Sequence, residues 1–80
     1  MITLYSKTQC PNCVHAKGLL ERKGIAFAEV NIEIDENARA FLIREGFRSV
    51  PQIFIDGEVV AGGYKWLVNQ PQEYFDNLIA

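Results

Sequence analysis

Cys10-Pro11-Asn12-Cys13 is the stretch of this sequence that decides the fold. It follows a strand-like run over residues 1–5 and opens a helix-like pattern through residues 14–20. These are the only two cysteines among the 80 residues. Two residues between cysteines at a strand-to-helix corner let both thiols meet within one helical turn. A disulfide there can open and close with little movement elsewhere, so the pair indicates redox chemistry.

The predicted position of the pair at a helix N-terminus favours a reactive thiolate. The first helical turn presents unpaired N–H groups and the positive end of the helix dipole. A cysteine at such a site has a pKa lowered to roughly 3.5–7.5, and the thiolate is the nucleophile. Cys10 stands just ahead of the helix, Pro11 suits the first helical position, and Cys13 lies inside the first turn. We therefore expect Cys10 to be the attacking thiol and Cys13 the resolving thiol.

Two other interpretations of the cysteine pair remain open. A structural disulfide would usually close a longer loop, because a short loop constrains the unfolded chain little. A structural zinc site needs about four ligands, whereas only Cys10, Cys13 and His15 lie close together in the sequence. We expect no metal, and we expect His15 to be an exposed helix residue.

Length and composition narrow the class of protein. The 80 residues suffice for one domain, expected over residues 1–80, and an apolar fraction of 49% is ordinary for a globular protein. The net charge of -2, with scattered basic residues, argues against binding to nucleic acid or to an anionic membrane. No apolar run approaches the roughly 20 residues that span a bilayer, and no signal peptide is evident. Together with one close cysteine pair, these features predict a cytoplasmic protein whose disulfide is transient.

The first part of the chain has a strand, helix, strand, helix pattern. The first helix is expected to run to about Lys23, with Gly24 just past its end. Residues 27–34 alternate between apolar and polar side chains, which predicts a second strand with one face more buried. Asp35 suits the N-cap of the next helix, and Gly46 ends that helix. This βαβ pattern requires a parallel pair of strands.

The last part of the chain changes to two strands and a helical segment. Residues 52–55 and 58–61 flank Asp56-Gly57, a strong signal for a two-residue hairpin. Residues 64–68 predict a helical turn, and Pro71 restarts or kinks the helix. The chain is therefore expected to be an α/β protein, βαβ followed by ββα. It would have a four-stranded mixed sheet flanked by three helical segments.

Several groups of residues, at a spacing that covers nearly the whole chain, are typical of one family. They are Tyr5-Ser6-Lys7 before the cysteine pair, Ala16-Lys17 and Leu19-Leu20 after it, Ser49-Val50-Pro51-Gln52-Ile53-Phe54-Ile55, and Gly62-Gly63. With this combination the chain resembles a glutaredoxin. The resemblance implies a thioredoxin-like fold and a dithiol enzyme that exchanges thiols and disulfides.

The resemblance also implies a binding site beside the cysteine pair. Pro51 would follow a cis peptide bond, although only about 5–6% of X-Pro bonds are cis and the sequence alone also allows a plain edge strand to start there. Val50 would offer its backbone N–H and C=O to an incoming disulfide peptide. Lys7 would hold a glutathione carboxylate, or else be an ordinary exposed loop lysine. The expected substrate- or glutathione-binding residues are Lys7, Pro11, Asn12, Val50, Pro51, Gly63, Tyr64 and Lys65.

Two departures from the family pattern bear on the electron donor. Asn12 stands where the family usually has an aromatic residue, so part of the wall for a bound thiol is absent. After Gly62-Gly63, glutathione-using members usually have an aspartate for the α-ammonium of glutathione, whereas this chain has Tyr64-Lys65-Trp66. Lys65 would repel that ammonium. We expect Tyr64 to flank the site and Trp66 to pack between helices.

A sister group of glutaredoxin-like redoxins shares some of these features. The basic Lys65, together with Gly46-Phe47-Arg48, resembles redoxins that are reduced by thioredoxin reductase and that donate electrons to ribonucleotide reductase. Cys10-Pro11 and residues 51–55 are closer to ordinary glutaredoxins. The expected partners are therefore glutathione as co-substrate, thioredoxin reductase, or both, and disulfide-containing proteins such as ribonucleotide reductase. We expect a monomer with no bound cofactor.

Two functions of other classes stay open. A glutaredoxin-like protein can carry an iron–sulfur cluster between two chains, with Cys10 and glutathione as ligands, but Pro11 tends to accompany redox catalysis in the family. A non-catalytic interaction domain that has kept the fold is hard to reconcile with an intact cysteine pair. The leading hypothesis is disulfide exchange by attack of Cys10 and displacement by Cys13.

Overall fold

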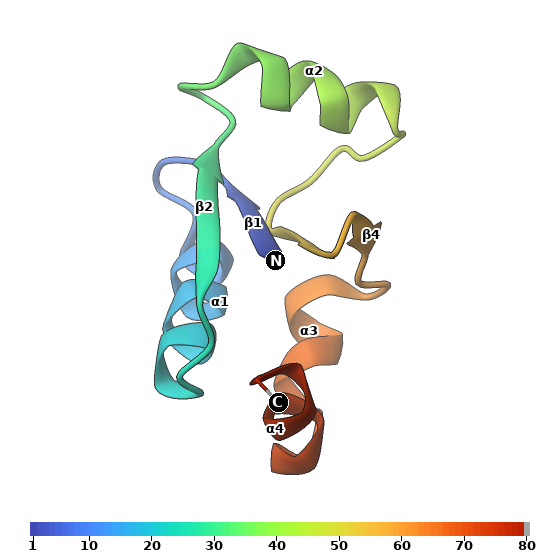
Figure 1. Cartoon of the computed structure of the whole chain (residues 1–80). Coiled ribbons are helices and arrows are strands. Elements are labelled where there is room, and N and C mark those ends of the chain that lie inside the picture. Colours follow the sequence, from blue (N-terminus) through green and yellow to red (C-terminus); the bar gives the residue numbers. More distant parts are fainter. Residues whose placement is uncertain (80) are drawn as a thin grey trace.

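The computed structural model describes residues 1–79 and contains a four-stranded sheet with helices on both faces (Figure 1). In chain order, the elements are β1 (Ile2–Ser6), α1 (Pro11–Arg22), β2 (Phe27–Asn31), α2 (Glu36–Arg44), β3 (Gln52–Ile55), β4 (Glu58–Val59), α3 (Gly63–Val68) and α4 (Gln72–Ile79). The α/β class and the predicted order βαβ followed by ββα are confirmed.

The sheet is mixed, with the strand order β2-β1-β3-β4. β1 pairs in parallel with β2 and antiparallel with β3, and β4 forms the antiparallel edge next to β3. The predicted hairpin turn joins β3 to β4: Asp56 has φ 51° and Gly57 has φ 86°. Positive φ at both central residues defines the turn type that matches the twist of the flanking strands.

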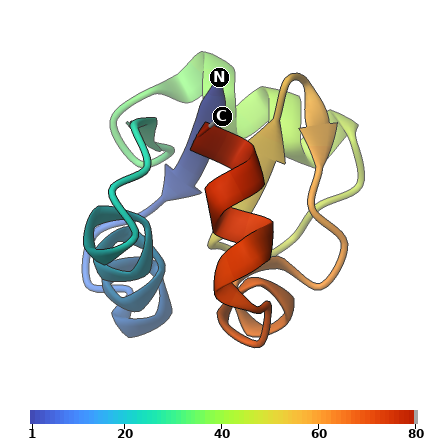
Figure 2. The same cartoon turned by 60° about the horizontal axis from the view of Figure 1, so that its bottom comes forward.

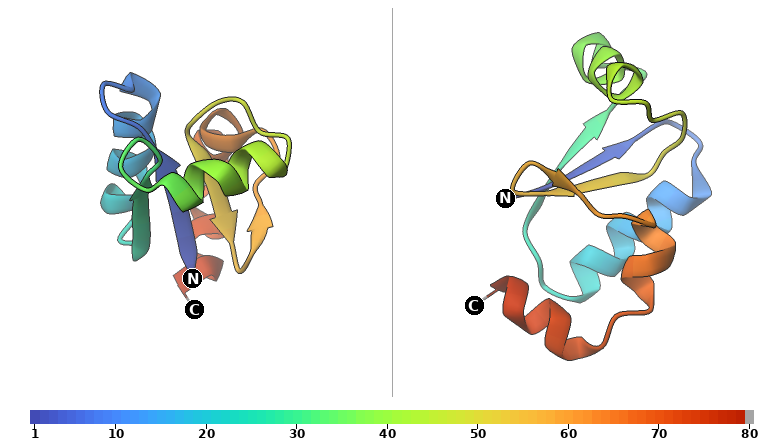
Figure 3. Two further views of the ribbon diagram at one scale, coloured as in Figure 1. Left: turned by 90° about the horizontal axis from the view of Figure 1, so that it is seen from above. Right: turned by 90° about the vertical axis from the view of Figure 1, so that its right-hand side faces the viewer.

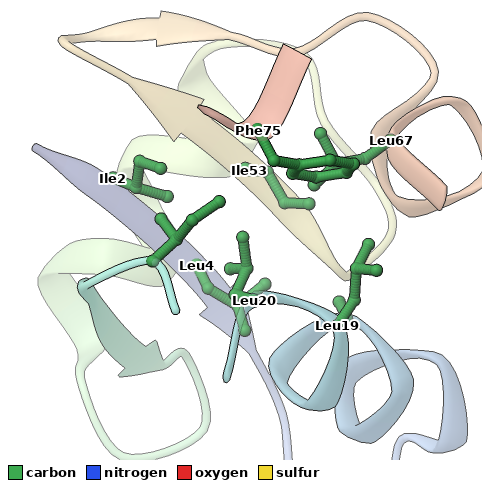
Figure 4. Packing of buried hydrophobic residues seen from close by; sticks show 9 residues of the cluster. Ile2, Leu4, Leu19, Leu20, Ile53, Leu67 and Phe75 are labelled. Atoms are coloured by element: carbon green, nitrogen blue, oxygen red, sulfur yellow. The ribbon is translucent and has the colours of Figure 1, made fainter. Parts of the chain in front are cut away.

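The two faces of the sheet carry different apolar layers. On one face, α1, α3 and α4 cover a mainly aliphatic core (Figures 2 and 3). The nine buried residues of this core are Ile2, Leu4, Ala16, Leu19, Leu20, Ile25, Ile53, Leu67 and Phe75, and Figure 4 shows them packed between the sheet and the helices. On the other face, α2 covers the sheet alone (Figure 3). There Phe41 of α2 packs on Tyr5 and Phe54, with ring centroids 5.9 and 5.7 Å apart.

The predicted restart of the helix at Pro71 is observed, and it divides the final helical segment in two. α3 ends at Val68, and α4 begins at Gln72, directly after Pro71. Proline at that position cannot continue the preceding helix. Residues 1–79 therefore contain four helices instead of the three helical segments expected.

The second strand is shorter than predicted and ends at Asn31 instead of continuing to residue 34. The side chain of Asn31 accepts a hydrogen bond from the backbone N–H of Glu33 (2.9 Å). The backbone carbonyl of Asn31 accepts hydrogen bonds from the backbone N–H groups of Ile34 and Asp35 (3.1 and 2.9 Å). These bonds turn the chain out of the sheet, and the Ile34 side chain is 80% exposed. The predicted cap at Asp35 is confirmed, because its carboxylate accepts from the N–H of Ala38 (3.0 Å).

None of the helices in residues 1–79 has the length and apolar character that crossing a membrane requires.

Replacing Ile53 by Ala should lower the free energy of unfolding by about 2–5 kcal/mol, because this β3 side chain has no exposed surface and its removal leaves a cavity. The matched change Ile34→Ala should alter it by no more than about 0.5 kcal/mol, since that side chain is mostly in solvent. Urea unfolding of the two variants measures both values. A loss at Ile34 as large as the loss at Ile53 would mean that the turn after β2 belongs to the core.

Candidate active site

Cys10 and Cys13 form a disulfide at the N-terminus of α1, with their Cα atoms 5.2 Å apart. Cys10 is the N-cap residue with an extended backbone, and Pro11 occupies the first turn. The Cys10 sulfur accepts a hydrogen bond from the backbone N–H of Cys13 at 3.2 Å. Cys10 and Cys13 are only 7% and 3% exposed, so Cys13 is the more buried of the two.

The loop before Cys10 is held by the turn that follows β2. The backbone N–H of Thr8 donates to the carboxylate of Glu33 at 2.6 Å, and the side-chain amide of Asn31 donates to the Thr8 hydroxyl at 3.3 Å. Gln9, directly before Cys10, adopts a positive φ of 56°. Sequence reasoning missed this clamp, since it treated Glu33 and Asn31 as the polar side of a longer strand. The only available signal was the turn-forming tendency of Asn31.

A second set of polar contacts ties α1 to the sheet. Glu29 of β2 accepts a hydrogen bond from the buried Ser6 hydroxyl of β1 (3.0 Å) and forms an ion pair with Lys17 of α1 (3.1 Å). The pKa of Lys17 is raised above its ordinary value by the hydrogen bond to Glu29, and further by the charge of that carboxylate. One carboxylate thus links the helix that begins with the cysteines to both parallel strands.

The segment that leads into β3 lies beside the disulfide. The Val50-Pro51 peptide bond is cis, as the family resemblance implied. The Val50 carbonyl oxygen is 4.0 Å from the Cys10 sulfur. Figure 3 (right) shows this segment and the loop before α1 at the same end of the central strands, which agrees with the pairing of Tyr5 with Gln52. The backbone of Val50 is therefore positioned next to the sulfur atoms.

Most of the predicted binding residues line one groove of about 510 Å³. They are Asn12, Val50, Pro51, Gly63, Tyr64 and Lys65, and the wall is completed by Phe47, Ser49, Gln52 and residues 59–62. Lys7 does not line this groove. It lies in a neighbouring hollow that shares Phe47, Ser49 and Val50 with the groove. Pro11 is exposed at the start of α1 and lines neither space.

The turn before α3 gives this wall its shape. Gly62 has φ 84°, and a Cβ atom at this position would lie 2.8 Å from the Cβ of Trp66, so only glycine fits. The Tyr64 ring faces the exposed His15 with centroids 6.1 Å apart, whereas Trp66 packs edge-on against Tyr74 of α4 at 5.4 Å. Tyr64 thus lies at the groove, and Trp66 packs between helices, as expected for both.

Over the range 1–79, the structure places no group of three or more histidine, cysteine, aspartate or glutamate side chains where they could jointly hold a metal ion. With its sulfurs at a helix N-terminus and a backbone edge alongside, the arrangement is suited to thiol–disulfide exchange.

Comparison with known proteins agrees with this geometry. The glutaredoxin family model matches residues 2–60. Glutaredoxin 3 of Escherichia coli (strain K12) is 42% identical over 62 residues, which cover 76% of this chain and 75% of that protein. Buckwheat glutaredoxin, solved as a complex with glutathione, is 26% identical with a TM-score of 0.71, covering 98% of this chain and 72% of that one.

A more distant structure shares the fold. The glutaredoxin-like protein NrdH-redoxin from Escherichia coli superposes with a TM-score of 0.73 at 23% identity, covering 96% of this chain and 92% of that one. At this identity the likeness establishes a common thioredoxin-like fold. Together with the family match over most of the chain, these findings show that the protein belongs to the glutaredoxin family and is a thiol–disulfide oxidoreductase with a Cys10–Cys13 pair.

Proposed function

We propose that the protein reduces disulfides in other proteins, and mixed disulfides with glutathione, in two exchange steps. The Cys10 thiolate attacks one sulfur of the substrate disulfide, which breaks that bond, forms a bond from Cys10 to the substrate, and releases the other sulfur as a thiolate. The Cys13 thiolate then attacks the Cys10 sulfur and displaces the reduced substrate. The Cys10–Cys13 disulfide that results takes two electrons from a separate donor before the next cycle.

One observation carries the assignment of Cys10 as the nucleophile. Its sulfur caps α1 and accepts the hydrogen bond from the N–H of Cys13 at 3.2 Å. In the reduced protein the same N–H group, with the positive end of the helix dipole, favours a thiolate at Cys10. Cys13 lies within the helix and is the more buried of the two, which suits a thiol that reacts only with Cys10.

The position of Val50 supports a docking role for its backbone. A substrate peptide bonded to Cys10 passes within a few ångströms of the Val50 carbonyl, which is 4.0 Å from the Cys10 sulfur. Backbone hydrogen bonds with an extended peptide give affinity that depends little on side chains. The groove beside Pro51 then binds the part of the substrate peptide that lies on one side of its reacting cysteine. The walls of this groove include Asn12, Gly63, Tyr64 and Lys65.

For the electron donor, the charge in this groove disfavours glutathione. Glutathione binds to the buckwheat relative, and its use by this protein is supported by that family membership. Among residues 1–79, however, Lys65 is the only charged residue that lines the groove, and its charge has the same sign as the α-ammonium of glutathione. We propose that glutathione is a usable but poor reductant. We also propose that thioredoxin reductase is the better donor, and that the protein acts in the cytoplasm on substrates such as ribonucleotide reductase.

The exchange mechanism predicts opposite behaviour for the two cysteine variants. Cys10→Ser should lose all thiol exchange, because no nucleophile remains at the helix end. Cys13→Ser should accumulate mixed disulfides with protein substrates and lose their net reduction, because nothing displaces Cys10. Mass spectrometry of each variant after incubation with an oxidised protein measures the adducts. If iodoacetamide at mildly acidic pH labels Cys13 before Cys10 in the parent protein, the assignment is wrong.

Lys65→Asp should raise the rate of reduction by glutathione by roughly tenfold. A charge-assisted hydrogen bond from the α-ammonium to the new carboxylate stabilises binding by about 1.5–3 kcal/mol, and screening by solvent reduces this gain. NADPH oxidation with glutathione and glutathione reductase, and separately with thioredoxin reductase, measures both donors. In the parent protein the thioredoxin reductase system should be the faster.

Two controls make this comparison specific. Lys65→Gln removes the charge without reversing it and should give an intermediate glutathione rate. Arg22→Asp changes the net charge by the same amount as Lys65→Asp, but at the last turn of α1, and should leave the glutathione rate unchanged. Equal glutathione rates in the parent and in Lys65→Asp would exclude Lys65 from the binding site.

A further inference from the structure

A separate groove, with a volume of about 660 Å³, lies at the β4 edge of the sheet (Figure 1). We call it the edge groove. It is lined by residues 55, 56 and 58–61 of the β3–β4 hairpin and by Trp66, Tyr74 and Leu78 of the last two helices. Residues 59–61 also line the groove that contains Lys65, so the two spaces share a wall.

The apolar part of the edge groove is an uncovered side of the aliphatic core. Ile55, Val60, Tyr74 and Leu78 pack against that core but are only partly buried. Trp66 packs edge-on against Tyr74 at 5.4 Å, yet 41% of its surface is exposed. Tryptophan and tyrosine next to partly buried aliphatic side chains are typical of the centre of a protein–protein contact. The edge groove therefore offers a partner an apolar surface that continues the core.

The charge of the edge groove selects the chemistry of that partner. Within residues 1–79, the charged residues that line it are Asp56 and Glu58, both acidic. Asp56 is paired with the terminal ammonium group of Met1 at 2.6 Å, whereas Glu58 is exposed and takes part in no salt bridge over the same range. A free carboxylate near an aromatic pair matches the guanidinium of arginine, which binds carboxylates with two hydrogen bonds and stacks on aromatic rings. The groove is therefore suited to an arginine side chain, whose aliphatic stem covers apolar surface.

The backbone of β4 is open to an extended partner segment. Val60 donates its N–H to the carbonyl of Ile53 at 2.7 Å, so the backbone groups of Val60 face β3. In an antiparallel pair the next residue points its N–H and C=O the other way, so those of Val59 point away from β3. β4 is the edge of the sheet over residues 1–79, and no strand pairs with Val59 on that side. An extended segment can add to such an edge and place alternate side chains on one face.

A second copy of this chain matches the edge groove less well than a basic partner does. A two-fold contact places the same surface of both copies face to face. It would bring Asp56 and Glu58 of each copy together, and the groove of the described chain contributes no basic side chain to offset them. Charge complementarity therefore favours a different protein whose contacting segment is basic.

We propose that the edge groove is a docking surface for an extended, arginine-bearing segment of a protein partner. The segment pairs with the backbone of Val59, and its arginine places the guanidinium against Glu58 and the ring of Trp66. An apolar side chain two residues from the arginine covers Leu78. This docking goes beyond the proposed function, because it needs neither cysteine. Since the edge groove shares residues 59–61 with the groove that contains Lys65, one partner can occupy both.

The test is a fluorescence titration of Trp66, the only tryptophan of the chain, with the peptide acetyl-Thr-Val-Thr-Arg-Thr-Val-Thr-amide. The peptide has no cysteine, and the protein is used with its disulfide closed, so binding is measured without exchange. The two valines lie on the same face as the arginine in either direction of the peptide. Matched peptides replace the arginine by glutamine or by glutamate. The arginine peptide should bind about fivefold more tightly than the glutamine peptide, and the glutamate peptide should bind most weakly.

Three protein variants locate the contact. Glu58→Gln should remove most of the difference in affinity between the arginine and glutamine peptides. Glu45→Gln, at the end of α2 on the other face of the sheet, removes an exposed carboxylate and should leave that difference unchanged. Trp66→Leu keeps an apolar side chain without the ring, and the amide NMR signals of residues 58–60 should show severalfold weaker binding of the arginine peptide. Equal affinities for the arginine and glutamine peptides, or equal losses in the two glutamate variants, would overturn the inference.

Two further measurements separate this inference from its alternatives. Sedimentation of the parent protein over a range of concentrations should show a monomer, and a dimer that the arginine peptide does not dissociate would mean that a second copy covers the edge groove, contrary to the inference. The reaction of the reduced protein with the 2-thiopyridyl disulfide of N-acetylcysteamine, a small neutral compound, tests the exchange mechanism alone. Reaction with this compound without binding of the arginine peptide would contradict the docking surface alone. Binding of the arginine peptide without that reaction would support the docking surface and contradict the exchange mechanism.

Discussion

The hydrogen bond from the Cys13 N–H to the Cys10 sulfur, at 3.2 Å, is the interaction on which the proposed exchange chemistry depends. It exists only if Cys10 caps α1 in an extended conformation and the helix begins directly after it. The polar contacts around the site serve this geometry. Glu33 and Asn31 hold the loop before Cys10, and Glu29 joins α1 to β1 and β2. Contacts with β2 and with the turn after it thus fix both sides of the cysteine pair.

The apolar layers on the two faces of the sheet position different parts of the site. The aliphatic core fixes α1, α3 and α4, and so sets the cysteines against the groove wall that follows Gly62. The aromatic layer holds α2 through Phe41, Tyr5 and Phe54, and so places α2 along the hollow that contains Lys7. Val50 lines both spaces. Val50 thus lies between Lys65 on one side and Lys7, Arg39 and Arg48 on the other.

Much of this could be predicted from the sequence because its signals are local. Alternating residues in β1, the Asp56-Gly57 turn and the position of the cysteines before a helix each depend on a few neighbouring residues. The end of β2 could not be predicted, because the alternation continues to residue 34 while the side chain of Asn31 turns the chain outward. The contact of Glu33 with Thr8 joins residues 25 apart in the sequence, and the hollow that contains Lys7 is lined by residues from separate parts of the chain. Such features depend on tertiary structure, which local patterns do not encode.

The central claim is that the N-terminus of α1 stabilises a thiolate at Cys10. The most direct measurement is a pH titration of the thiolate ultraviolet absorbance in reduced Cys13→Ser, which keeps the backbone N–H of residue 13 and leaves one thiol. We expect a midpoint well below the value of about 8.5 for a free cysteine, within the range of roughly 3.5–7.5 for activated thiols. A midpoint at or above about 8.5 would contradict it, because the helix end would then give the sulfur no stabilisation.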